Sequence, residues 1–209
     1  KPITFACPEV GEPVGCRVEL SNKYNMNLGQ VKIWSAARKN SWESEAGWTL
    51  RSFERTADDV VHNPKAYIAV DKVLDITQYM SADGTLAWSA PESGKWTILR
   101  IGNVNAGEKN GPAPEEGTGW ECDKLSTEGP EVHYAGYIGR LTSGVLQGGK
   151  LNSLLLDSWE CNTQTWTMKM EDEFKRVSGY NLRKWLPAVI GYVVDDPQTT
   201  SRFLLDWRT

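Results

Sequence analysis

The 209-residue sequence lacks the short motifs of several large enzyme classes. It has no GxxxxGKS/T phosphate loop, no GxGxxG segment after a predicted strand, no GxSxG turn and no HExxH helix. Phosphate-loop, dinucleotide-binding, α/β-hydrolase and HExxH metalloprotease chemistries are therefore disfavoured. Only two histidines are present, His62 and His133, and both lie in polar stretches. We expect them at the surface rather than in a Ser-His-Asp triad.

A strongly basic region and a bilayer-length apolar segment are also missing. The formal net charge is −4 and no lysine- or arginine-rich block stands out, so we expect no nucleic-acid partner. No apolar stretch approaches the roughly 20 residues that span a bilayer, and no signal segment begins the chain, so we expect no membrane span. The chain begins at Lys1 and stops at residues 206–209 inside a predicted helix. We therefore expect a fragment or processed piece of a longer protein.

Cysteine is scarce, and the four residues present do not form the CxxC pairs typical of zinc sites; they are Cys7, Cys16, Cys122 and Cys161. Metal-thiolate chemistry is therefore not expected. For Cys7 and Cys16 two alternatives stay open. One is a disulfide formed in an oxidising compartment, and the other is a pair of free, buried thiols.

Tryptophan, in contrast, is abundant, with ten residues. Most of them lie in polar or glycine-rich surroundings, although any single one is best interpreted as a packing residue. As a group they favour contact with carbohydrate, because a flat apolar ring suits the C–H face of a sugar.

The pattern predicts an α/β chain in which a β-rich region precedes a βα-repeating unit, part of a barrel or of a doubly wound sheet. In residues 1–95 short strand-like runs at 31–34 and 66–70 are separated by Gly, Pro, Asn and Asp, and Asp83-Gly84 suits a hairpin turn. The polar segment 41–48 suits an exposed loop or lid.

The pattern of residues 96–209 predicts the βα-repeat portion of a barrel or doubly wound sheet, truncated at its C-terminal end. The expected order is a strand at 96–102, a long loop at 103–119, a helix at 130–141, a strand ending at 156, a helix at 165–178 ended by Gly179, a short helix at 181–186, a strand at 189–194 and a helix from about 200.

The main candidate site follows the apolar run Leu154–Leu156, which stops at Asp157, Trp159 and Glu160. In a β/α barrel the chemistry lies where buried strands end. Glu160 is the candidate general acid, because burial against Trp159 and a nearby charge at Asp157 would raise its pKa. Alternatively, both acids cap the following helix or pair with a basic residue.

A second group of acids surrounds the Gly117–Trp120 segment and comprises Glu115, Glu116, Glu121 and Asp123. Several oxygen ligands in a glycine-rich loop suit a hard cation such as Ca²⁺, but the spacing matches no EF-hand. Two alternatives are solvated loop acids and a sugar-facing role for Trp120 and Glu121.

Several segments resemble glycoside hydrolase family 106, and the resemblance extends from about residue 30 to the end. The segments are Trp96–Gly102, Asn110–Pro114, Gly119–Ser126, Asp157–Glu160, Gln164–Thr167, Trp185–Pro187 and Phe203–Arg208.

This resemblance implies an inverting α-L-rhamnosidase-like enzyme that acts on rhamnosides of plant or pectic polysaccharides, often with calcium. It implies a (β/α) barrel with β-sandwich domains and a periplasmic or secreted location. Glu160 would be the general acid. The residues lining the sugar or cation pocket would be Asp157, Trp159, Trp120, Glu121 and Asp123.

The chain departs from the family in length, because family members are several times longer. The catalytic base is therefore expected beyond Thr209, and these 209 residues alone are expected to be inactive. The rival interpretations are a carbohydrate-binding module with a tryptophan-lined glycan site and a structural β-rich domain.

Overall fold

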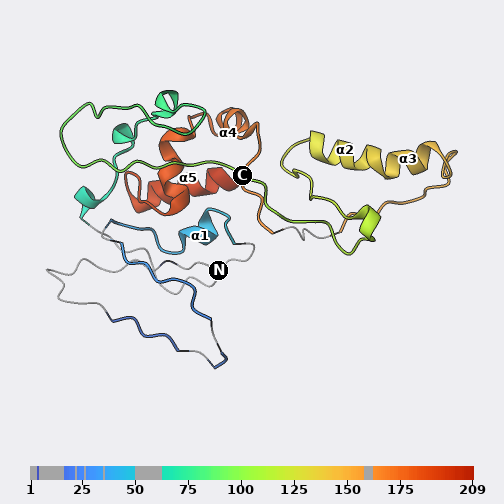
Figure 1. Ribbon diagram of the computed structural model, residues 1–209, viewed down its shortest axis with the longest axis horizontal. Helices are drawn as coiled ribbons and strands as arrows, with labels where there is room; N and C mark the ends of the chain where they lie inside the picture. Colours follow the sequence, from blue (N-terminus) through green and yellow to red (C-terminus); the bar gives the residue numbers. More distant parts are fainter. Residues whose placement is uncertain are drawn as a thin grey trace. The chain divides into compact units, whose positions relative to one another are not determined.

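The computed structural model describes Thr4 and residues 17–21, 23–25, 27–34, 36–49, 63–157 and 162–209 (Figure 1). The chain divides into two compact units, which are described separately. The first unit comprises Lys1–Ala46, Ser52–Pro91 and Arg183–Thr209, and the second comprises Gly47–Arg51 and Glu92–Leu182.

Three helical elements form the centre of the first unit and contact one another in pairs: α1 (Trp42–Glu45), the 3-10 segment η5 (Arg183–Ile190) and α5 (Pro197–Arg208). Short 3-10 turns, η1 (Pro64–Ala66), η2 (Val70–Lys72) and η3 (Thr77–Tyr79), lie between α1 and η5 along the chain. Its buried apolar residues are Ala37, Ala46, Ala188, Val189, Val193, Val194, Phe203, Leu204 and Trp207.

The helix α5 shows why this sequence becomes helical. Its buried residues Thr200, Phe203, Leu204 and Trp207 recur at the spacing of one helix face. Asp196 caps the N-terminus by accepting a hydrogen bond from the backbone N–H of Thr199 (2.8 Å). The helix predicted from about residue 200 is therefore confirmed, with its start three residues earlier.

The segment predicted as an exposed loop or lid, residues 41–48, is instead partly helical, and α1 within it lies against the core. Glu43 and Ala46 are buried, and the Trp207 indole N–H donates to the Ala46 carbonyl (2.9 Å). The prediction was wrong because polar residues here find partners inside the protein. The fully buried Lys39 ammonium lies 3.3 Å from the Glu45 carboxylate.

The strand predicted at 189–194 is also wrong. Val189 and Ile190 belong to η5, and the following residues make only isolated bridges, Arg38 with Tyr192 and Ile68 with Val194. The short helix predicted at 181–186 is a 3-10 segment that runs through Pro187. Most of the apolar run at 189–194 is nevertheless buried. Its apolar pattern therefore predicted burial correctly and secondary structure incorrectly.

The second unit contains the exposed 3-10 turn η4 (Glu115–Gly117) and three helices, α2 (Glu128–Gly136), α3 (Ile138–Ser143) and α4 (Met170–Ser178). The helices α2 and α3 follow one another with a break at Tyr137, which confirms the helix predicted at 130–141 apart from this break (Figure 1). The predicted helix at 165–178 forms only from Met170, and Gly179 ends it at φ 81°.

The predicted α/β fold class, a (β/α) barrel portion preceded by a β-rich region, is overturned. Helices but no β-strands occur in the described part of the chain, where pairing is limited to isolated bridges. Three of the runs expected to be strands lie open to solvent: Ile33 and Ile98 are exposed, and Leu156 is 93% exposed. A strand needs a neighbouring strand for its backbone groups, and an apolar run does not specify one.

The predicted boundary between a β-rich region at 1–95 and a βα-repeat portion at 96–209 stays a prediction.

None of the helices in the described ranges is long and apolar enough to cross a bilayer.

Gly191 provides a test of the packing between the turn after η5 and α1. It has φ 91°, and a Cβ at this position would lie 2.5 Å from the Trp42 indole. We expect Gly191→Ala to lower the free energy of unfolding by about 2–5 kcal/mol, the sum of left-handed strain and overpacking. Urea denaturation followed by circular dichroism measures the change.

Gly179 is the matched control. It has a similar φ of 81°, but no atom lies within 4 Å of the point that a Cβ would occupy there. Gly179→Ala should therefore show the strain alone, about 1–2 kcal/mol. Equal losses for the two variants would contradict the close approach of Trp42.

The N-cap of α5 predicts a dependence on pH. The Thr199 hydroxyl and backbone N–H donate to Asp196 and hold the pKa of that carboxyl below its ordinary value. A lowered pKa in the folded state stabilises the protein above the unfolded pKa of about 4, and this stabilisation is lost as the pH falls through the folded pKa. We expect Asp196→Ala to cost about 1 kcal/mol at pH 7 and less near pH 3. Thermal unfolding at both pH values tests this, and Asp196→Asn, which keeps a capping oxygen, is the control.

Candidate functional site

The long loop predicted at 103–119 is present and is closed by backbone hydrogen bonds. The N–H of Asn110 donates to the Gly119 carbonyl (3.0 Å), and the N–H of Glu121 donates to the Glu108 carbonyl (3.1 Å). These bonds hold the two ends of the loop side by side.

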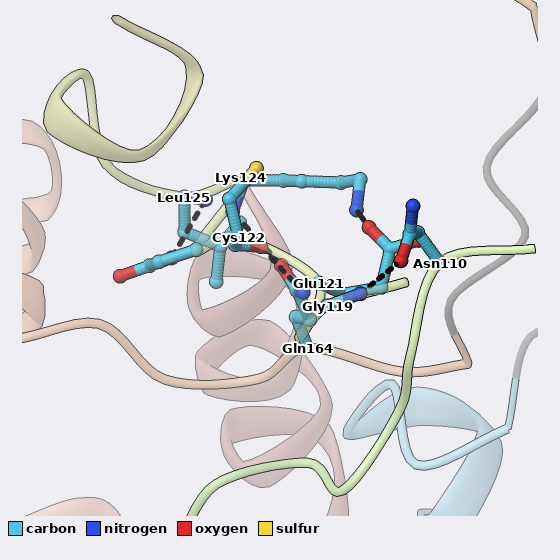
Figure 2. Close-up of polar contacts among 8 residues, drawn as sticks. Asn110, Gly119, Glu121, Cys122, Lys124, Leu125 and Gln164 are labelled. Atoms are coloured by element: carbon cyan, nitrogen blue, oxygen red, sulfur yellow. Dashed lines mark hydrogen bonds and ion pairs between the residues drawn. The ribbon is translucent and has the colours of Figure 1, made fainter. Parts of the chain in front are cut away.

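The carboxamide of Asn110 closes the loop a second time. Its Nδ2 donates to the Gly117 carbonyl (3.0 Å), and its Oδ1 accepts from the Gly119 N–H (2.6 Å), as Figure 2 shows for the second bond. One side chain therefore satisfies two backbone groups across the loop. Trp120, which follows directly, is carried on an ordered backbone although its side chain is 62% exposed.

Gln164 joins the end of this loop to a distant part of the chain. Its Nε2 donates to the Cys122 carbonyl (3.0 Å) and its Oε1 accepts from the Lys124 N–H (3.0 Å), as seen in Figure 2. The carboxamide thus pairs with the backbone much as a neighbouring strand would.

Two further hydrogen bonds run in parallel with this one. The Thr167 hydroxyl donates to Asp123 Oδ2 (2.7 Å), and Asn162 Nδ2 donates to the Glu108 carboxylate. The segment 162–167 is therefore fixed to the segment 108–124, which we call the 108–124 loop. Asn162, the first residue of this fixed segment, follows Glu160 by two positions in the sequence.

The predicted site residues fall into two sets. Glu160 and Trp159 lie outside the described residues. Asp157 lies in an exposed, irregular segment, and Trp120, Glu121 and Asp123 lie at the end of the 108–124 loop; the catalytic and binding roles of all six stay predictions.

The carboxylates of the 108–124 loop are engaged in structural bonds. Glu121 is paired with the Lys124 ammonium, and the two are the labelled ion pair of Figure 2. Asp123 accepts from the Leu125 N–H (2.9 Å) through one oxygen and from Thr167 through the other. These acids therefore shape the backbone around Trp120.

The same bonds bear on the predicted cation site. In the described ranges no three acids, cysteines or histidines converge as metal ligands, and Glu115 and Glu116 are exposed on η4. The described acids of the loop therefore do not fit a Ca²⁺ site, and calcium stays a prediction. The thiol of Cys122 is free and partly buried.

Asn110, Asn162, Gln164 and Thr167 were not identified as site residues from the sequence. Asn110, Gln164 and Thr167 lie in segments that carry the family resemblance, which was the only available signal. The partners of Gln164 and Thr167 lie 40 or more residues away, so no local pattern predicts their contacts.

The closed loop with an exposed indole, beside the segment that follows the candidate acid, suits a glycoside hydrolase. The chain belongs to glycoside hydrolase family 106, whose model, described as alpha-L-rhamnosidase, matches residues 15–209. The family suggested by the sequence is thereby confirmed.

Two relatives extend this finding. The chain is 38% identical over 146 residues to a Formosa agariphila protein named "Putative beta-glucuronidase", covering 69% of this chain and 12% of that protein. It is also similar to a solved rhamnosidase from Novosphingobium sp. PP1Y, with a TM-score of 0.66 and 30% identity, covering 86% of this chain and 18% of the other. The chain thus spans less than a fifth of the length of each relative.

The two hydrogen bonds of Gln164 predict the effect of its removal. Gln164→Leu leaves the Lys124 N–H and the Cys122 carbonyl without their partner, at a cost of about 1–3 kcal/mol. We expect hydrogen exchange at the Lys124 amide to accelerate tenfold or more. Gln164→Glu keeps the acceptor but loses the donor and should show a smaller effect.

Thr163→Val is the matched control, because the Thr163 hydroxyl has no hydrogen bond to any residue in the described ranges. Unchanged exchange at Lys124 in Gln164→Leu would show that the Gln164 carboxamide does not hold the loop.

Proposed function

We propose that this chain forms part of the active site of an inverting α-L-rhamnosidase, with Glu160 as the general acid. The family match over residues 15–209 carries the proposal. The hydrogen bonds between the 108–124 loop and the segment 162–167 support it, because they bring an exposed indole close in the fold to the chain that follows Glu160.

The proposed reaction assigns different tasks to two carboxyl groups. In an inverting glycosidase one carboxylic acid protonates the departing glycosidic oxygen, while a carboxylate activates water on the opposite face of the sugar. Glu160 has the first task. The second belongs to a base outside these 209 residues, so the proposal includes that the chain alone is inactive.

The described contacts favour Glu160 over the neighbouring acids as proton donor. Glu121 is bound to Lys124, and both oxygens of Asp123 accept hydrogen bonds. In the proposal these two residues hold the shape of the sugar pocket. Trp120 provides an apolar face for the C–H groups of the sugar, and Trp159 and Asp157 complete the pocket.

The proposed substrate is a rhamnoside of a plant or pectic polysaccharide. A β-glucuronide is the second candidate, because the name of the Formosa agariphila relative points to it. A polysaccharide substrate favours a periplasmic or secreted location. We also propose that calcium supports the activity, which is tested by measuring turnover after EGTA treatment and again after calcium is restored.

The general acid can be tested by varying the leaving group. In the complete natural protein, Glu160→Gln should lower turnover of an unactivated rhamnoside by about 10²–10⁴-fold, because the departing alkoxide needs a proton. Turnover of 4-nitrophenyl α-L-rhamnoside, whose leaving group needs little protonation, should fall much less. Steady-state kinetics with both substrates, and with 4-nitrophenyl β-D-glucuronide, measure the difference.

Glu115→Gln is the control, because Glu115 is an exposed acid on η4. It should leave both rates unchanged. An equal fall for both rhamnosides in Glu160→Gln would contradict the role of general acid. A wild-type protein that binds rhamnosides but hydrolyses none of the three substrates would favour the carbohydrate-binding module instead.

A further inference from the structure

Lys109 and Trp120 face each other across the closed end of the 108–124 loop. They form an antiparallel bridge, and the Lys109 ammonium lies 5.4 Å from the centroid of the Trp120 ring. Both side chains are exposed. A cation over an indole is favourable, but at an exposed position the stabilisation is small.

The carboxylates next to Lys109 and Trp120 in the sequence are bonded to other residues. Glu108, its neighbour in sequence, accepts a hydrogen bond from Asn162, and Glu121, the neighbour of Trp120, is paired with Lys124. Among the residues that the structure describes, Lys109 makes no ion pair. Glu108 and Glu121 therefore contribute to other contacts of the 108–124 loop.

The backbone beneath this pair is held before any ligand arrives. The Asn110 carboxamide bonds two backbone groups across the loop, and Glu121 N–H bonds to the Glu108 carbonyl. A ligand that contacts Lys109 and Trp120 therefore has little loop backbone to order. Because less conformational entropy of the loop is lost on binding, the affinity for such a ligand is higher.

We propose that Lys109 and Trp120 form a subsite for a sugar unit that carries a negative charge, a carboxylate or a sulfate ester. The apolar face of the sugar packs on the exposed indole while its anionic group pairs with the Lys109 ammonium. A neutral sugar gains only the first contact. The inference rests on the proposed function for the rhamnosyl unit of the ligand, and it specifies the substrate further as an anionic rhamnose-containing glycan.

The single ammonium of lysine does not select between the two anions, because it acts as a point charge and not as a planar fork. The test therefore uses three thio-linked disaccharides, which resist hydrolysis. In each of them L-rhamnose is linked to a second unit, which is glucose, glucuronate or glucose 6-sulfate. Their dissociation constants for the complete natural protein are measured by calorimetry at low and at high salt.

We expect the wild-type protein to bind at least one anionic disaccharide about threefold to fivefold more tightly than the neutral one at low salt, the range of an exposed ion pair. The preference should shrink at high salt, because screening weakens exposed charge pairs. Whichever anion is preferred supports the proposal and identifies the chemical class of the unit.

The variants separate charge from stacking. Lys109→Gln should abolish the preference and leave affinity for the neutral disaccharide unchanged, while Lys109→Arg should keep the preference. Trp120→Ala should weaken binding of all three. Lys95→Gln, which removes another exposed lysine of the same unit, is the control and should change nothing.

Equal affinity of the wild-type protein for the neutral and anionic disaccharides, no binding of any of them, or an equal effect of Lys95→Gln and Lys109→Gln would each overturn the subsite. Because binding is measured without turnover, failure of the proposed function has a different signature. A protein that keeps the anion preference but hydrolyses no rhamnoside retains the subsite and loses the assigned activity.

Discussion

The two hydrogen bonds between the Gln164 carboxamide and the backbone of Cys122 and Lys124 are the constraint on which the candidate site depends. The described chain around them has no strand ladder, so the backbone groups of the 108–124 loop must find partners elsewhere. A carboxamide is suited to this task, because it offers a donor and an acceptor in the same plane as a peptide group. With Asn110 performing the same task inside the loop, two amide side chains replace the secondary structure that the site lacks.

In the first unit, charged and polar side chains likewise connect segments that are distant in the sequence. Lys39 is fully buried beside Glu45, and Ser201 of α5 donates to the same carboxylate (3.2 Å). The indole of Trp42 donates to Thr4 (2.8 Å), whose hydroxyl in turn donates to Glu43. A buried charge is tolerated only with such partners. Polar residues therefore join α1 to α5 and to the start of the chain, where an apolar pattern would have been expected.

These features explain which predictions succeeded. Helices can be predicted from the sequence because the spacing of their apolar residues and their capping residues are local signals. The helix α4 ends at Gly179, and α5 begins after Asp196. The strand predictions were wrong because a strand forms only when its backbone pairs with that of another segment. The apolar run at 154–156 gives no information on whether such a segment is present, and its leucines are exposed. For the site, the sequence identified the two acid groups, and the family resemblance suggested that they belong together. Gln164 was missed because its role exists only through residues about 40 positions away.

The close approach of Gly191 to Trp42 has a consequence for the history of the chain. Any side chain at position 191 meets the indole, whereas a smaller residue at position 42 would remove that obstacle and leave only the cost of a positive φ. The residues acceptable at one position thus depend on the other, although 149 positions separate them in the sequence. Such dependence is epistasis in a physical form. Family members that have lost the tryptophan should be the ones in which the glycine has been free to change.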